Sequence, residues 1–115
     1  MKEPFKPSPN LSKEINDAIA ESELQGGVFV KDLPRLTTLV VDTKNSRYIL
    51  IHEAKGWVVS GGTHFPNPVP CYINGSTWGG SMLKVGFIGR GMRLELTIGG
   101  RTLTTTTIQE ITEIR

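Results

Sequence analysis

Two histidines and one cysteine are the side chains best suited to bind a metal ion. His52, His64 and Cys71 are separated by twelve and seven residues, and the chain has no second cysteine. Structural zinc sites need four ligands at close, characteristic spacings, and this pattern matches none of them. We therefore expect no metal site and no other cofactor, and we expect His52 to be a hydrogen-bonded structural residue.

Nucleophilic and acid–base chemistry has few candidates. His64 can be paired on paper with Ser60 or Ser81, but the chain contains no Gly-x-Ser-x-Gly nucleophile motif. The carboxylates of the predicted strands stand singly, without the close pairing that separates two pKa values for acid and base work. The sequence predicts no catalytic residue and no enzyme, and a cryptic hydrolase around His64 is the least favoured hypothesis.

The most distinctive local segment surrounds the second tryptophan with small residues, in the order Gly-Ser-Thr-Trp-Gly-Gly-Ser from Gly75 to Ser81. Small residues around one aromatic ring can form a shallow pocket whose backbone N–H groups meet a ligand. The alternative, which we favour, is that the ring fills the core and the glycines turn the chain. The predicted ligand-binding residues are Trp78, Gly79, Gly80, Ser81 and Tyr72.

Charge gives a second candidate site. The net charge is +2, with −2 over residues 1–30 and +4 over residues 31–115. Single-stranded nucleic acid needs cations for its backbone and flat rings for its bases. The residues that could supply both are Lys84, Phe87, Arg90, Arg93 and Arg101. No recognised nucleic-acid signature accompanies them, so nucleic acid is the alternative partner rather than the favoured one.

The elements that must position these residues begin with a Pro-rich segment. Residues 1–10 contain three prolines and are predicted to form a flexible tail. Apolar residues then recur at helical spacing, and Gly26-Gly27 ends the pattern. We predict an amphipathic helix over residues 11–27, which must dock on its own domain or on a partner.

From Val28 onward the apolar period shifts toward two, which indicates strands. We predict strands over residues 36–42, 47–53, 57–60, 69–73 and 92–98, and the last of these turns at Gly99-Gly100 into a partner strand over 101–106. Residues 61–70 hold three prolines and are predicted as a loop, with Asn74-Gly75 as a turn. The C-terminal isoleucines, spaced by three, suggest a 3₁₀ turn and a closing strand over 108–114, and residues 81–90 are left unassigned.

These elements predict one mainly β domain over residues 28–115. Short strands joined by Gly-rich turns favour a small antiparallel barrel, SH3-like or Sm-like, with the single N-terminal helix. The alternative is a two-layer α+β sheet with that helix across it. The chain of 115 residues has no apolar run of membrane-spanning length and no visible signal peptide. We therefore expect a cytoplasmic protein without a membrane partner.

Four blocks of the sequence resemble a group of short bacterial and phage-associated proteins. The blocks are Asn45-Ser46-Arg47-Tyr48, the segment from Gly75 to Ser81, Gly91-Met92-Arg93-Leu94-Glu95, and the Thr-rich turn into Ile108 and Ile111. The resemblance covers residues 36–114 and implies domain limits but no particular activity.

Taken together, these patterns favour a non-enzymatic binding or assembly module that holds a peptide, another protein or its own copy. A single-stranded nucleic-acid-binding barrel is the alternative hypothesis.

Overall fold

The computed structural model describes residues 26–79 and 82–114. Strands make up 74% of it, so the prediction of a mainly β domain is confirmed. The predicted tail and nearly all of the predicted helix lie outside the described residues. In chain order the elements are β1 (Gly27–Phe29), the 3₁₀ helix η1 (Val30–Asp32), β2 (Thr38–Thr43), β3 (Arg47–Glu53), β4 (Gly56–Gly61), β5 (Phe65–Gly79), β6 (Met82–Val85), β7 (Phe87–Gly89), β8 (Arg93–Ile98) and β9 (Arg101–Ile114).

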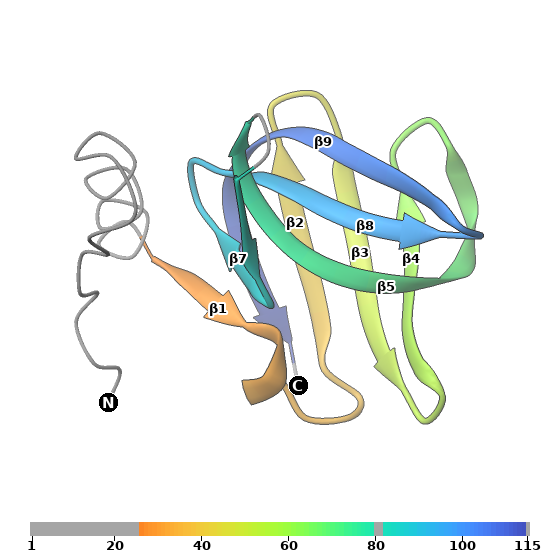
Figure 1. Cartoon of the computed structure of the whole chain (residues 1–115). Helices are drawn as coiled ribbons and strands as arrows, with labels where there is room; N and C mark the ends of the chain where they lie inside the picture. The colour runs from red at the N-terminus through yellow and green to blue at the C-terminus, as the bar shows by residue number, and fades with distance from the viewer. Residues whose placement is uncertain (1–25, 80–81, 115) are drawn as a thin grey trace.

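Six of these strands form a closed ring of antiparallel pairs. β2 pairs with β3, β3 with β4, β4 with β5, β5 with β8 and β8 with β9, and β9 returns to pair with β2. β6 extends the sheet beyond β5, and β1 pairs with β7 as a separate two-stranded sheet. Figure 1 shows β2, β3 and β4 nearly upright, with β5 and β8 crossing in front of them.

The core lies inside this ring and follows the predicted alternation. Four leucines are fully buried: Leu94 and Leu96 of β8, Leu39 of β2 and Leu50 of β3. Arg93, which precedes Leu94 in β8, faces outward and is exposed. Burying each leucine contributes about 2 kcal/mol. The β8–β9 hairpin turns at Gly99-Gly100 as predicted, and both glycines have positive φ, as a tight two-residue hairpin turn requires.

Residues 65–70 are strand, so the predicted loop over 61–70 is wrong for most of its length. Pro66, Pro68 and Pro70 occupy alternate positions of β5, so the N–H groups they lack would all point to one edge. β4 pairs with this stretch of β5, while pairing with β8 begins only at Tyr72, after the last proline. The prolines are therefore tolerated because they face an edge that forms no ladder there.

β-bulges explain two further secondary-structure predictions that are wrong. Asn74-Gly75 is not a turn but lies inside β5, where the register with β8 shifts between Ile73 and Gly75. The C-terminal isoleucines belong to one continuous strand, β9, rather than to a 3₁₀ turn. Asp42 pairs with Glu110 and Thr43 with Ile108, so one extra residue in β9 lets Ile108 and Ile111 both face the core at a spacing of three.

The loop between η1 and β2 contains a strained residue. Leu36 has φ +70° and is the one non-glycine residue with positive φ in the described part of the chain. Its N–H donates to the His52 carbonyl (2.8 Å), and the Thr37 N–H donates to the Pro34 carbonyl (3.2 Å). The backbone is thus fixed in a turn that favours glycine, although the Leu36 side chain is 80% exposed.

No helix within the described residues is both long and apolar enough to cross a membrane.

Candidate functional site

Most of the segment that the sequence left unassigned forms two short strands, β6 and β7, which meet at Gly86. Gly86 has φ +70°. Its N–H donates to the Asn74 carbonyl of β5 (2.9 Å), and its carbonyl accepts from the Val30 N–H that follows β1 (2.8 Å). β5 and β1 therefore lie along opposite edges of the β6–β7 segment, β5 beside its first half and β1 beside its second.

The register of this segment shows where the backbone groups of β6 point. Val85 pairs with Gly75 and Lys84 with Ser76, and the bonded pair of Gly86 and Asn74 continues the same register. Hydrogen-bonded and non-hydrogen-bonded pairs alternate along an antiparallel ladder. Lys84 therefore bonds to β5, whereas the N–H and C=O groups of Leu83 and Val85 point to the opposite edge.

That opposite edge of β6 is open in the part of the chain that the structure describes. The ladder of β1 against β7 ends where Val30 begins η1, and β6 pairs with β5 alone. The Val85 side chain is 74% exposed, a high value for a β-branched apolar residue in a strand. We call Met82–Val85, with the outward groups of Leu83 and Val85, the β6 edge.

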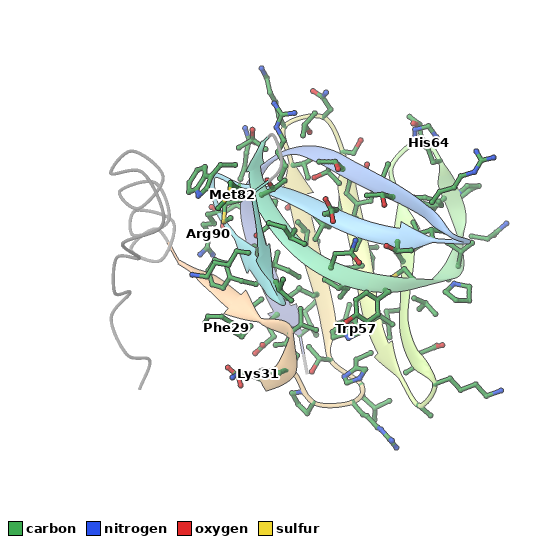
Figure 2. All side chains as sticks on the ribbon, viewed as in Figure 1. Phe29, Lys31, Trp57, His64, Met82 and Arg90 are labelled. Carbon is green, nitrogen blue, oxygen red and sulfur yellow. The ribbon has the colours of Figure 1, made fainter. Side chains whose placement is uncertain are left out.

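Two lysines and two phenylalanines lie beside the β6 edge. The Phe29 and Phe87 rings face each other across β1 and β7, with centroids 4.9 Å apart. The Lys84 ammonium lies 4.4 Å from the Phe87 centroid and 5.7 Å from the Phe29 centroid, and the Lys31 ammonium lies 5.9 Å from that of Phe29. Figure 2 shows Phe29 on β1 and Lys31 on η1, on the same side of the molecule. The arrangement holds two positive charges over one aromatic pair.

Trp78 is half-buried and is not among the residues that make up the main core cluster or pack against it. Its Nε1 is buried and has no hydrogen-bond acceptor among the described residues. Gly79 follows it at a bulge held by Thr77, whose Oγ1 donates to the Met82 carbonyl and accepts from the Gly79 N–H (3.1 Å). Gly80 and Ser81 lie outside the described residues.

Tyr72 does not join Trp78. It is 69% exposed and pairs with Thr97 of β8. The two aromatic residues are six positions apart on β5, which corresponds to about 20 Å along a strand. The two aromatic residues therefore lie far apart along β5.

The predicted nucleic-acid residues are only partly brought together. Lys84 and Phe87 are neighbours, but Phe87 is 1% exposed, so its ring offers no face to a base. The Arg90 side chain donates to the Ile111 carbonyl (3.3 Å) and lies 3.7 Å from the Glu110 carboxylate.

The two remaining arginines of that set lie on β8 and β9. Arg93 begins β8 on its exposed face, whereas Arg101 pairs with Ile98 at the other end of that strand. The five residues therefore do not form one surface along which a nucleic-acid backbone could run.

His52 and Cys71 take structural positions, whereas His64 is exposed on a turn. His52 donates from Nδ1 to the Leu33 carbonyl (3.0 Å), as predicted for a structural histidine, and stacks on Trp57 with centroids 4.6 Å apart. Cys71 pairs with Trp57 across β4 and β5, and burial raises the pKa of its thiol to about 11. Figure 2 shows His64 on the turn before β5, away from Trp57. Within the described residues, no three His, Cys, Asp or Glu side chains lie close enough together to hold a metal ion.

Sequence reasoning missed both the residues of the β6 edge and those that lie beside it. Leu83, Val85, Phe29 and Lys31 carry no motif. The available signal was the mostly apolar stretch before Gly86. Only the strand register shows that its outward backbone groups have no neighbouring strand in the described part of the chain.

No family model, no curated protein and no solved structure matches this chain. The resemblance to short bacterial and phage-associated proteins stays a prediction.

Proposed function

We propose that this protein is a non-enzymatic binding module that pairs an extended polypeptide with the β6 edge. The observation that supports this proposal best is the outward direction of the Leu83 and Val85 backbone groups where the ladder of β1 stops. A strand added there would extend the line of β1 and receive its main-chain hydrogen bonds from β6.

The strength of such pairing can be bounded from the groups available. Two outward residues offer two N–H donors and two carbonyl acceptors, and each hydrogen bond contributes about 0.5–1.5 kcal/mol net. The exposed Val85 side chain adds apolar contact. These gains must exceed the cost of ordering the partner, so we propose a moderate and reversible affinity rather than a permanent complex.

Trp78 gives further support at the other end of the edge. Its indole N–H is buried without an acceptor among residues 26–79 and 82–114, and leaving such a donor unpaired costs about 1–3 kcal/mol. Trp78 lies on β5 beside the pair formed by Gly79 and Met82, the first residue of β6. A carbonyl group of the bound polypeptide is a suitable acceptor.

The rest of the proposal concerns the scaffold. We interpret the closed ring of six strands as a small antiparallel barrel, and the SH3-like or Sm-like assignment stays a proposal. In the closed ring each strand pairs on both sides, and the prolines of β5 line the stretch of its edge that forms no ladder. β6 lies outside the ring and pairs with β5 alone within the described part of the chain, so its other edge is suited to accept a partner.

The test selects phage-displayed random peptides on the full chain and maps their contacts by amide NMR. We expect the selected peptides to shift the amides of Met82–Val85 and to slow hydrogen exchange at Leu83 and Val85. The Val85→Pro variant removes one outward N–H and no bond to β5, so it should lose binding, whereas Val85→Ala should retain it. Peptides that bind Val85→Pro with undiminished affinity, or that shift only the amides around Tyr72, would refute the proposal.

A further inference from the structure

The outer surface of the ring is polar over one strand and apolar over another. On β8, the side chains that alternate with the buried leucines, and so point away from the core, are Arg93, Glu95 and Thr97. Such alternation is typical of a strand with one face in water. On β3, the two central residues that point away from the core are Ile49 and Ile51. This part of the outer surface therefore lacks the polar side chains that solvent favours.

Ile49 and Ile51 lie at the centre of a larger apolar surface. Val40 of β2 is directly opposite Ile49, and Val58 of β4 is directly opposite Ile51. Ile114 of β9 lies beyond β2 and is 52% exposed. Among the described residues that form the core cluster or pack against it, none of these five appears. We call these five residues the β3 face, and a contiguous apolar surface of this kind marks an interaction site.

The charges at the two ends of β3 indicate which partner this face fits. Arg47 and Glu53 are the first and last residues of the strand, and both are exposed on the side of Ile49 and Ile51. The outward residues of β3 thus run from a cation through two isoleucines to an anion. The Asp42 carboxylate accepts two hydrogen bonds from Arg47 (2.6 and 3.3 Å), which hold the guanidinium in place. A guanidinium has five N–H groups, so Arg47 keeps donors for a further carboxylate.

This pattern is complementary to itself. Two copies can pack face to face about a two-fold axis that lies in the plane of contact and is perpendicular to β3, so that their β3 strands are antiparallel. Ile49 of each copy then lies over Ile51 of the other copy, and Arg47 lies over Glu53. A parallel arrangement would instead place each charge over its own kind, which disfavours association. A second copy, antiparallel at β3, is therefore the partner whose charges fit the face.

We infer that the β3 face is the interface of a dimer of this chain, with antiparallel β3 strands and an Arg47–Glu53 ion pair at each end. This inference concerns a different surface from the β6 edge. Four strands about 4.8 Å apart, each about seven residues long, give a face of roughly 20 by 20 Å, or about 400 Å² per copy. Stable specific interfaces bury about 800 Å² per partner, so the dimer is weak and reversible, with a dissociation constant of about 10 μM to 1 mM.

The experiment is sedimentation velocity of the full chain over that concentration range. We expect the weight-average sedimentation coefficient to rise with concentration as dimers form. Ile51→Lys places an ammonium group of each copy in the apolar centre and should raise the dissociation constant by at least about tenfold. Glu53→Lys removes both ion pairs and should raise it by at least about twofold. Asp32→Lys on η1 makes the same change in net charge outside this face and should leave the constant unchanged.

Amide NMR of the wild-type chain at increasing concentration locates the contact without any variant. We expect concentration-dependent shifts centred on Ile49 and Ile51, and this readout keeps the test decisive if Ile51→Lys fails to fold. A chain that stays monomeric at the highest concentration would overturn the inference. A dimer that Ile51→Lys leaves unchanged, or whose amide shifts lie at Met82–Val85, would overturn it as well. Peptide binding at the β6 edge should be equal in the wild type and in Ile51→Lys, so the proposed function is tested separately.

Discussion

Replacing Leu36 by glycine should stabilise this protein, although it deletes an apolar side chain. Leu36 has φ +70° in a turn fixed by two backbone hydrogen bonds, which a glycine would keep. The left-handed region costs a non-glycine residue about 1–2 kcal/mol. Glycine also makes the unfolded chain more flexible, and this opposes folding by about 0.4–1 kcal/mol. The side chain is 80% exposed, so its deletion removes little burial.

The expected net gain for Leu36→Gly is about 0.5–1 kcal/mol in the free energy of unfolding. For a domain of this size that gain raises Tm by roughly 2–6 °C. Urea denaturation followed by tryptophan fluorescence and a thermal melt would both measure it. Leu36→Ala is the matched control, because it removes most of the side chain but keeps the Cβ atom and hence the strain. A Leu36→Gly variant no more stable than Leu36→Ala would show that the turn holds no strain.

Three further predictions concern buried groups. Ser76→Ala should lower the free energy of unfolding by about 1–3 kcal/mol, because the buried Oγ donates to the Phe87 carbonyl (2.5 Å). Urea denaturation measures this loss, and an unchanged midpoint would contradict the prediction. Gly75→Ala should cost about 2–5 kcal/mol, because its Cβ would lie 2.1 Å from the Lys84 carbonyl oxygen at φ +144°. The control Gly99→Ala has nothing within 4 Å and should cost about 1 kcal/mol in the same assay, so equal losses would count against the steric argument. The Cys71 thiol should react with iodoacetamide at a rate that keeps rising up to a pH of about 11, and a plateau near pH 9 would refute its raised pKa.

The raised pKa of Cys71 also makes the stability of the fold depend on pH. The unfolded thiol ionises near its ordinary value of 9.0, and the folded thiol only at about 11. Above pH 9 the unfolded state therefore binds fewer protons, so stability falls as the pH rises through this window and is unaffected by this group below it.

Local patterns predicted the strands of the β2–β3 and β8–β9 hairpins. The alternation of β8 and the Gly99-Gly100 turn define a hairpin without further information. β5 was mispredicted because the acceptability of its prolines depends on which edge is paired, and that edge is set by strands distant in sequence. The spacing of Ile108 and Ile111 failed for a similar reason, since the bulge that brings both inward exists only against β2.

The candidate site shows the same limit. The residues around Trp78 stand out in composition, and the sequence directed attention to them. The β6 edge lacks any compositional signal, because an open edge is defined by the absence of a neighbour at particular backbone groups. Phe87 looked suitable for base stacking until its burial was known.

The pairing of β2 with β9 has a consequence for biosynthesis. It joins Thr38 to Ile114, so the first and last strands of the ring meet only after all the strands between them have been made. During translation β2, β3 and β4 emerge early and can form a meander. The free edge of β4 is then covered by β5, but that of β2 must wait until β9 leaves the ribosome. A nascent chain at that stage exposes sheet edges to other proteins in the cell. Premature stop codons within β9 should therefore yield aggregation-prone products rather than shortened, functional domains.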